Sequence, residues 1–211
     1  MTENITVFKH SSIKILTEVG AVYIDPFQID EEFHDAAFIL ITHDHYDHFS
    51  SKDIRKVAGK DTVLVVPDAM EEKTGEVYDI VKRIETITPG ATFNIGGLEF
   101  ETVPMYNILK PFHPRKAGWV GYILTVNGQR IYIAGDIDLI KEARAVKCDV
   151  ALVPVGGFYT MDAVKAAKLV NEIKPSVAIP VHYGNLVGST KDAGKFAELV
   201  REPVKVEIKI K

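Results

Sequence analysis

The chain has 211 residues, of which 46% are hydrophobic and 26% are charged, and it carries a formal net charge of -4. A chain of this size and composition buries a large core, and the lack of a general positive charge argues against extended nucleic-acid binding. Because the only cysteine, Cys148, excludes an internal disulfide, any metal has to be held by histidines and carboxylates. We therefore expect a small-molecule substrate.

No apolar run approaches the ~20 residues that span a bilayer, and residues 1–10 lack the basic start and apolar stretch of a signal peptide. These features predict a cytoplasmic protein without a membrane span. Association into a homo-oligomer is expected only because such assemblies are common, since no segment marks a self-association surface.

The secondary structure begins with short segments rich in β-branched residues and then alternates between strands and helices. Ser50 is a candidate N-cap for the first helix. We expect strands at residues 5–8, 13–16, 21–25, 37–42, 62–66, 99–104, 120–126, 130–134, 150–154, 177–181 and 204–210. We expect helices at residues 51–57, 161–173 and 191–200.

The fold class follows from this order of elements. Several strands are apolar throughout, which is typical of strands buried on both faces, so they need cover on each side. We predict an α/β fold in which two mixed sheets pack face to face with helices outside, a four-layer αββα sandwich. No repeat or linker divides the chain, so we expect a single domain over residues 1–211.

A dense set of metal-ligand side chains follows the apolar strand predicted at residues 37–42. Three histidines and an aspartate lie within six residues, namely His43, His45, Asp47 and His48. Imidazole and carboxylate groups at a strand end are typical of sites for zinc, manganese or iron. A solvated polar loop is the alternative, but it does not explain such a set directly after a buried strand. The spacing suits two ions, one on each side of the loop.

Two further residues stand at strand ends. Asp136 follows the strand at 130–134, with Gly135 allowing close approach, and His182 follows the strand at 177–181. Taken alone, Asp136 is equally well explained as a turn or helix-cap residue and His182 as a core histidine. Together with residues 43–48 they indicate one cleft.

This pattern resembles the metallo-β-lactamase superfamily, whose His-x-His-x-Asp-His motif, strand-end Asp and late strand-end His match residues 43–48, Asp136 and His182. Asp25-Pro26 and residues 132–136, 154–162 and 180–184 look most like a branch that includes ascorbate-6-phosphate lactonase and the N-acyl-phosphatidylethanolamine phospholipase D enzymes. These motifs are specific for the fold and metal site and weak for the substrate.

The resemblance implies two divalent metal ions, with zinc favoured and manganese or iron as alternatives. It implies that one ion is held by the first two histidines of the motif and the other by its last two residues with His182, while Asp136 bridges them. Asp25 would orient a ligand histidine, although a plain Asp-Pro turn explains it equally well. His10 is a candidate contact to a ligand or to the substrate.

The family pattern expects one more histidine after the strand at 99–104, and this sequence has Met105-Tyr106-Asn107 there. Asn107 could supply a weaker oxygen ligand, or His113 could reach back from six residues later. If neither binds, the first position would be labile. The sequence leaves these alternatives open.

The implied reaction is hydrolysis of an ester, lactone or phosphodiester bond by a metal-bridging hydroxide, with Asp47 or Asp136 accepting the proton. The loop at 110–116 suits a partly apolar anionic substrate, with a solvated surface loop as the equally weighted alternative. The candidate substrate contacts are Lys110, His113, Arg115, Lys116 and Tyr159. A Gly-rich turn is a competing explanation for the last of these.

Three other functions fit less well. A di-iron protein of this fold typically has a carboxylate at the place of His45 and a flavin domain, for which 211 residues have no room. A nuclease of the same fold is disfavoured by the net negative charge. A non-catalytic metal-binding module is motivated by the histidine missing at Asn107, because a fold does not determine its function.

Overall fold

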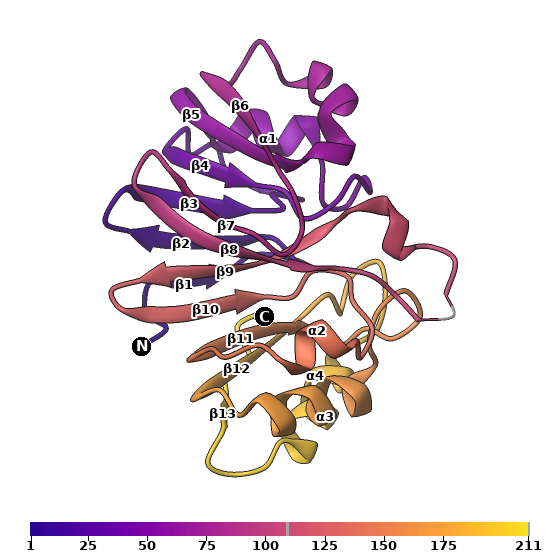
Figure 1. Ribbon diagram of the computed structural model, residues 1–211. Helices are drawn as coiled ribbons and strands as arrows, with labels where there is room; N and C mark the ends of the chain where they lie inside the picture. The colour runs from indigo at the N-terminus through magenta and orange to yellow at the C-terminus, as the bar shows by residue number, and fades with distance from the viewer. Residues whose placement is uncertain (109, 211) are drawn as a thin grey trace.

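The computed structural model describes residues 1–108 and 110–210. The N-terminal part of the chain forms a six-stranded sheet with the strand order β1-β2-β3-β4-β5-β6 (Figure 1). Its strands are β1 (Ile5–Val7), β2 (Ile13–Thr17), β3 (Gly20–Ile24), β4 (Ala36–Leu40), β5 (Ala58–Pro67) and β6 (Arg83–Ile87). The first three pair antiparallel and the last four pair parallel, so the sheet is mixed.

The rest of the chain forms a seven-stranded sheet with the order β13-β12-β11-β10-β9-β8-β7. Its strands are β7 (Thr92–Ile95), β8 (Leu98–Pro104), β9 (Val120–Val126), β10 (Gln129–Ile133), β11 (Val150–Pro154), β12 (Val177–Val181) and β13 (Lys205–Val206). Pairing is antiparallel from β7 to β10 and parallel from β10 to β13. The prediction of two mixed sheets is therefore confirmed.

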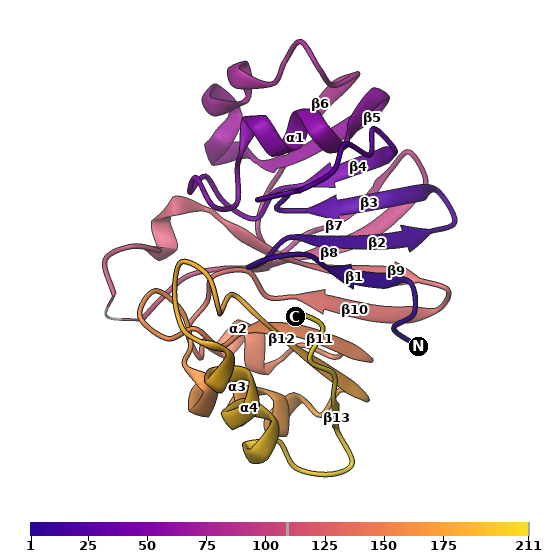
Figure 2. The same cartoon turned by 180° about the vertical axis from the view of Figure 1, so that it is seen from behind.

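Helices cover the outer face of each sheet (Figures 1 and 2). The first sheet packs against α1 (Ser51–Val57) and the 3-10 helix η1 (Asp68–Glu76), and the second against α2 (Lys141–Arg144), α3 (Ala163–Ile173) and α4 (Thr190–Leu199). A short 3-10 helix, η2 (Arg115–Ala117), lies in the loop between β8 and β9. A shared apolar core fills the space between the sheets. The αββα sandwich is confirmed.

The helices begin where side chains cap them. Ser50 accepts a hydrogen bond from the backbone N–H of Asp53, so α1 has the predicted bounds. The helix predicted from residue 161 begins at Ala163 instead, because Asp162 is the N-cap and accepts from Lys165 N at 2.8 Å. Among the described residues, no helix has the length and apolar character needed to cross a membrane.

The prediction of a long last strand is wrong. Only Lys205 and Val206 pair with β12, although the whole segment alternates in polarity. Beyond them the chain turns toward the N-terminus, where Thr2 Oγ1 donates to the Glu207 carboxylate at 2.6 Å and Lys209 Nζ donates to Thr2 O. The strands β6 and β7 were not predicted, because most of their residues are exposed or half-buried and their sequences therefore lack a recognisable apolar pattern.

Candidate metal centre

The polar side chains of the centre follow strands that end at one edge of the sandwich. In the first sheet β1, β3 and β4 run in the same direction, and in the second sheet β8, β10 and β12 do so. The loops after them meet at the right-hand edge of Figure 1. Sites in sheets with parallel strands are typically built at such carboxyl ends. The residues contributed there are His10, Asp25, His43, His45, Asp47, His48, His113, Asp136 and His182.

We define the first group as His43, His45 and His113, whose candidate ligand atoms all lie within 4.8 Å of one another. His43 Nε2 and His45 Nδ1 face each other at 3.1 Å. The ring of Trp119 packs 5.1 Å from both, measured between centroids, and closes the buried side. Burial lowers the pKa of His43 well below its usual value, so this ring is neutral and keeps a lone pair for a cation.

Asn107 lies beside the first group and does not belong to it. Its Nδ2 lies 3.0 Å from Nδ1 of His113 and also donates to the Tyr159 carbonyl, which ties two loops together. The Nε2 atom of His113 therefore faces the cluster. Of the two residues left open by the sequence, His113 is brought next to His43 and His45, and the Oδ1 atom of Asn107 is buried without a hydrogen-bond partner.

We define the second group as His10, Asp47, His48 and His182. His10 Nε2 donates to Asp47 Oδ2 at 3.0 Å, and His182 Nε2 lies 3.9 Å from the same oxygen. Burial lowers the pKa of His10 to about 4 against the effect of this hydrogen bond. Burial by itself would raise the pKa of Asp47, but the hydrogen bond and the neighbouring His48 outweigh it and lower the value to about 2. This carboxylate is ionised at neutral pH.

Asp136 lies between the two groups. Its Oδ1 is 3.4 Å from His48 Nε2, and its Oδ2 is 3.0 Å from His182 Nε2 and 3.4 Å from His113 Nε2. The preceding Gly135 has φ +65°, and a Cβ there would come within 2.5 Å of the Met105 sulfur. Glycine is therefore required to bring the carboxylate this deep.

A buried carboxylate orients His48 from behind. Asp25 Oδ2 accepts from His48 Nδ1 at 2.7 Å, and its two oxygens also accept from the backbone and hydroxyl of Thr42. Burial opposes a charge on His48, but Asp136 and Asp25 outweigh it and raise the pKa of this histidine well above its usual value. The space at its Nε2 atom therefore favours a positive charge, whether a proton or a metal ion.

The cluster leaves buried polar atoms without hydrogen-bond partners, which a fully satisfied polar core would not do. The unpartnered atoms include Nε2 of His48, His113 and His182 and Oδ1 of Asp136. These four atoms belong to the two groups or to the aspartate between them, while Asn107 Oδ1 and Tyr132 OH are also unpartnered. Imidazole nitrogens with carboxylate oxygens form a donor set suited to first-row divalent ions. The residues present therefore fit a metal centre.

Backbone strain accompanies the centre. His10, Asp25 and His182 have φ values of 58°, 47° and 59°, in the left-handed region that residues other than glycine rarely adopt. Such conformations cost on the order of 1–3 kcal/mol each and are found mainly at functional sites.

The cluster opens into a cleft of about 320 Å³. Its floor is formed by metal-centre side chains, and its walls are largely apolar. The described residues that line it are His45, Tyr46, Asp47, Phe112, His113, Asp136, Tyr159, His182, Leu186 and Val187. Of the sequence candidates for substrate contact, His113 and Tyr159 are therefore in the lining.

The three basic candidates are placed differently. Lys110 lies 3.5 Å from Asp138 and donates to the Thr160 carbonyl. Arg115 pairs with a carboxylate of α2 at 3.1 Å and stacks over an aromatic ring. Lys116 is exposed on η2. The structure brings none of these three into the cleft lining, because acidic partners hold the first two elsewhere.

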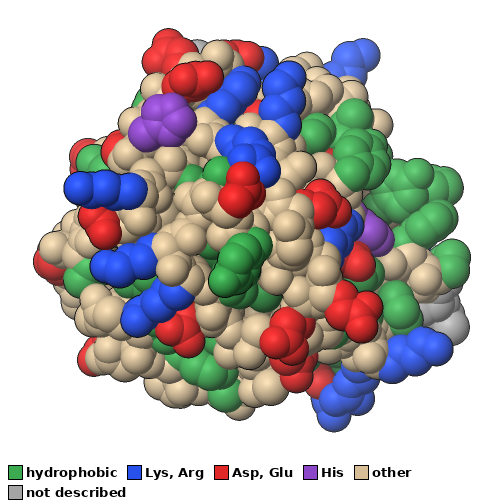
Figure 3. All heavy atoms as spheres, turned by 90° about the horizontal axis from the view of Figure 1, so that it is seen from above, with side chains coloured by type: hydrophobic (Ala, Val, Ile, Leu, Met, Phe, Trp, Pro, Cys, Tyr) green, Lys and Arg blue, Asp and Glu red, His purple; other side chains and the backbone are tan. Residues whose placement is uncertain are grey.

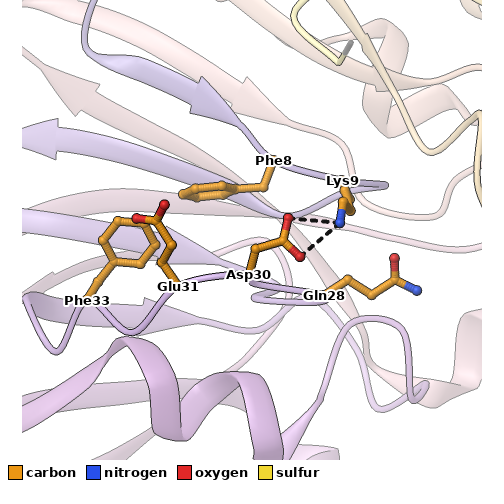
Figure 4. A pocket seen from close by; sticks show the side chains of 6 residues that line it. All are labelled: Phe8, Lys9, Gln28, Asp30, Glu31 and Phe33. Carbon is orange, nitrogen blue, oxygen red and sulfur yellow. Dashed lines mark hydrogen bonds and ion pairs between the residues drawn. The ribbon is translucent and has the colours of Figure 1, made fainter.

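Another hollow, of about 400 Å³, lies beside Phe8 and Phe33 (Figure 4). Lys9 and Asp30 face each other across it and pair at 2.9 Å, so they satisfy each other's charge. Its described lining residues include no histidine and no unpaired metal-ligand cluster. The chemistry of the molecule is thus concentrated in the cleft over the two histidine groups.

Sequence reasoning did not identify Tyr46, Leu186 and Val187 as site residues. Tyr46 stands inside the ligand motif, and the other two follow His182 by four and five residues. Nearness to a ligand along the chain was the available signal, but an aliphatic side chain in a loop carries no chemical mark of its own.

Comparisons with known proteins agree with this fold. The family model described as the beta-lactamase superfamily domain matches residues 4–182. A UPF0173 metal-dependent hydrolase of Pyrococcus furiosus is 32% identical over 202 residues, covering 89% of this chain and 88% of that protein.

Solved structures are similar over nearly the whole chain. A protein of Parabacteroides distasonis described as a metal-dependent hydrolase has a TM-score of 0.83 at 31% identity, covering 98% of this chain and 93% of its own. Igni18, a metallo hydrolase from Ignicoccus hospitalis, has a TM-score of 0.77 at 22% identity, covering 97% and 93%, and shows the shared fold. The chain belongs to the metallo-β-lactamase superfamily and, within it, to the UPF0173 metal-dependent hydrolases.

Proposed function

We propose that this hydrolase works with two metal ions and cleaves an ester, lactone or phosphodiester bond of a small substrate. The observation that carries this proposal is the position of Asp136, whose two oxygens face histidines of both groups at 3.0–3.4 Å. A carboxylate between two sets of imidazoles is suited to bridging two cations.

The proposed ligands divide between the two groups. The first ion would be held by His43, His45 and His113, and the second by Asp47, His48 and His182, with Asp136 shared. Zinc suits this mixture of imidazole and carboxylate best, and manganese or iron are alternatives. His10 would hold Asp47 in place through its hydrogen bond, and Asp25 would hold His48.

When bound, such ions lower the pKa of water and polarise the attacked carbonyl or phosphoryl oxygen. The protein supplies two ionised carboxylates at the floor of the cleft. Asp47 and Asp136 both line it, and neighbouring histidines lower the pKa of each. Either can accept the proton released by an attacking water. No serine or cysteine nucleophile is needed for this chemistry.

The bond type is supported only by motif resemblance. Residues 132–136 and 180–184 resemble enzymes that open a lactone or cleave a phosphodiester, and these bonds suit the same water attack. The expectation of an anionic substrate rested on the loop at 110–116, whose described basic residues lie outside the cleft lining.

The test combines metal analysis with hydrolysis assays. The purified protein is expected to carry close to two divalent ions per chain and to hydrolyse members of a panel of lactones, carboxylic esters and phosphodiesters. His48→Ala is expected to lose metal and activity together, while His34→Ala, an exposed histidine far from the cluster, serves as the matched control. An active His48→Ala protein with unchanged metal content would contradict the proposal.

A further inference from the structure

The walls of the cleft are apolar, in contrast with its floor. We define the apolar cup as Tyr46, Phe112, Tyr159, Leu186 and Val187, all of which line the cleft above the metal centre. Tyr46, Phe112 and Leu186 are large apolar side chains that remain 68%, 42% and 41% exposed. Single exposed apolar residues are ordinary, but a cluster around a concave site is typical of ligand binding.

The aromatic side of the cup is held in a fixed arrangement. Phe112 meets Tyr159 edge to face at 4.8 Å between ring centroids, and Phe158 meets the same ring in the same way at 4.8 Å. On the other side Tyr46 packs against Phe27 at 6.2 Å. Figure 3 shows hydrophobic side chains gathered around a histidine at this edge of the molecule. The rings therefore support one another before a ligand arrives.

Charge is absent from the walls of the cup. None of the described residues lining the cleft is lysine or arginine. Lys110 pairs with the buried Asp138 at 3.5 Å and Arg115 pairs with Glu142 at 3.1 Å, and neither base lines the cleft. An anionic group placed against these walls would lose its hydration without gaining an ion pair, which is costly.

The volume of the cleft limits the size of the group that can bind there. The cleft of about 320 Å³ is at the small end of ligand sites. An apolar cavity of roughly 150 Å³ accommodates a benzene molecule, so the cleft has room for a reacting group at the metal centre and about one ring beyond it. A long acyl chain would extend past the rim into water.

We propose that the substrate carries a compact, uncharged apolar group, such as an aryl or branched alkyl group, next to the bond that is cleaved, and that the apolar cup binds this group. The inference rests on the proposed function for the position of the reacting bond. From the sequence we expected an anionic substrate, whereas the part of the substrate that lies away from the metal centre is here proposed to be uncharged. A membrane surface is the other possible occupant of exposed rings, but the concave shape over the metal centre favours a small molecule.

The experiment uses two metal-binding probes that differ only in their apolar part. Benzohydroxamate and acetohydroxamate present the same chelating group, with a phenyl ring or a methyl group attached. Titration calorimetry on the metal-loaded protein is expected to show benzohydroxamate binding about 10-fold tighter or more, the scale of an apolar pocket's discrimination. Equal affinities, or binding of acetohydroxamate without binding of benzohydroxamate, would overturn the proposal whatever the activity, whereas binding of neither probe would contradict the proposed metal centre.

A charge placed in the cup gives the matched test. Leu186→Lys is expected to remove the preference for benzohydroxamate, measured as the ratio of the two affinities in the same variant, while leaving the metal content unchanged. Tyr78→Lys is the control, because Tyr78 is 76% exposed and lies outside the cleft lining. An unchanged preference in Leu186→Lys would contradict the assignment.

Hydrolysis and membrane binding separate the remaining outcomes. Benzoyl esters are expected to be cleaved with a kcat/KM about 10-fold or more above that of the matched succinyl esters. A preference for benzohydroxamate without any hydrolysis would support apolar binding by the cup and contradict the proposed reaction. Preferred cleavage of the succinyl esters would support the proposed reaction and contradict apolar binding by the cup. Sedimentation with phosphatidylcholine vesicles that is lost in Phe158→Ser would identify the rim as a membrane surface and overturn the proposal.

Discussion

The two histidine groups of the metal centre differ in charge and in the way the chain builds them. The first group has three imidazoles and no carboxylate of its own, and His113 reaches it from a long loop. The second group includes Asp47 together with His10, His48 and His182, and His182 follows β12 directly. A carboxylate adds a full negative charge beside a cation, so the second group is expected to hold its ion more tightly.

This difference indicates that the arrangement of the first group depends on neighbouring side chains that are not themselves members of the group. Asn107 fixes the His113 ring, and Trp119 packs against the group from the buried side. The second group has the buried carboxylate of Asp25 behind His48, and Asp136 faces both groups.

The largest effect on metal binding and activity is expected at Asp136, which lies between the two groups. Asp136→Asn keeps the shape of the side chain and removes the charge facing both groups, so we expect both ions to bind weakly and kcat/KM to fall by about 10³-fold or more, equivalent to several kcal/mol of transition-state stabilisation. Metal content by mass spectrometry and steady-state kinetics measure this. Retention of two tightly held ions would show that this carboxylate does not bridge the groups.

The next largest effect is a difference in metal content between variants of the two groups. His182→Ala is expected to remove the tightly held ion, whereas His113→Ala is expected to keep it and lose only the labile one. Both variants lose most activity if two ions are needed. Competition with a chelator of known affinity, followed by metal analysis, distinguishes them. Equal metal loss in the two variants would remove the proposed ranking of the groups.

A smaller effect is expected from the support of His113. Asn107→Ala frees the ring from its partner and is expected to weaken the labile ion by about 10–100-fold while leaving the tight ion in place. Asn171→Ala is the control, since that exposed amide of α3 bonds only backbone groups at the end of α4 and just beyond it, Leu199 O and Arg201 N, away from the metal centre. A normal metal affinity in Asn107→Ala would mean that the loop alone positions His113.

The smallest effect concerns stability and pH. Burial lowers the pKa of His10 to about 4 from the ordinary 6.5, so the unfolded state takes up a proton first as the pH falls. In the chelator-treated protein, titration of this histidine is expected to lower the free energy of unfolding by about 1–2 kcal/mol as the pH falls from 7 to 5. Urea unfolding of wild type and His10→Gln, which keeps a donor toward Asp47 and does not titrate, measures the difference. Parallel pH profiles would exclude this role.

The sequence predicted the layers well because apolar strands carry their own signal. The segments at β4, β10, β11 and β12 are nearly continuous runs of buried side chains, and each has a ligand residue or cleft residue after it. The segments at β6 and β7 were not predicted, because edge positions expose much of each strand. The segment at β13 was overestimated, because polarity alternates along it beyond the two residues that pair.

By itself, the sequence determined the sandwich, the ligand motif at residues 43–48 and its partners Asp136 and His182, because each of these depends on local residue type and spacing. Only the tertiary structure placed His113 beside His43 and His45, drew His10 against Asp47, and left Lys110 and Arg115 outside the cleft lining. Those outcomes depend on which loops lie side by side in space and on which acidic side chain pairs with each basic one. Contacts between residues far apart in the chain leave no trace in the local pattern of a single sequence.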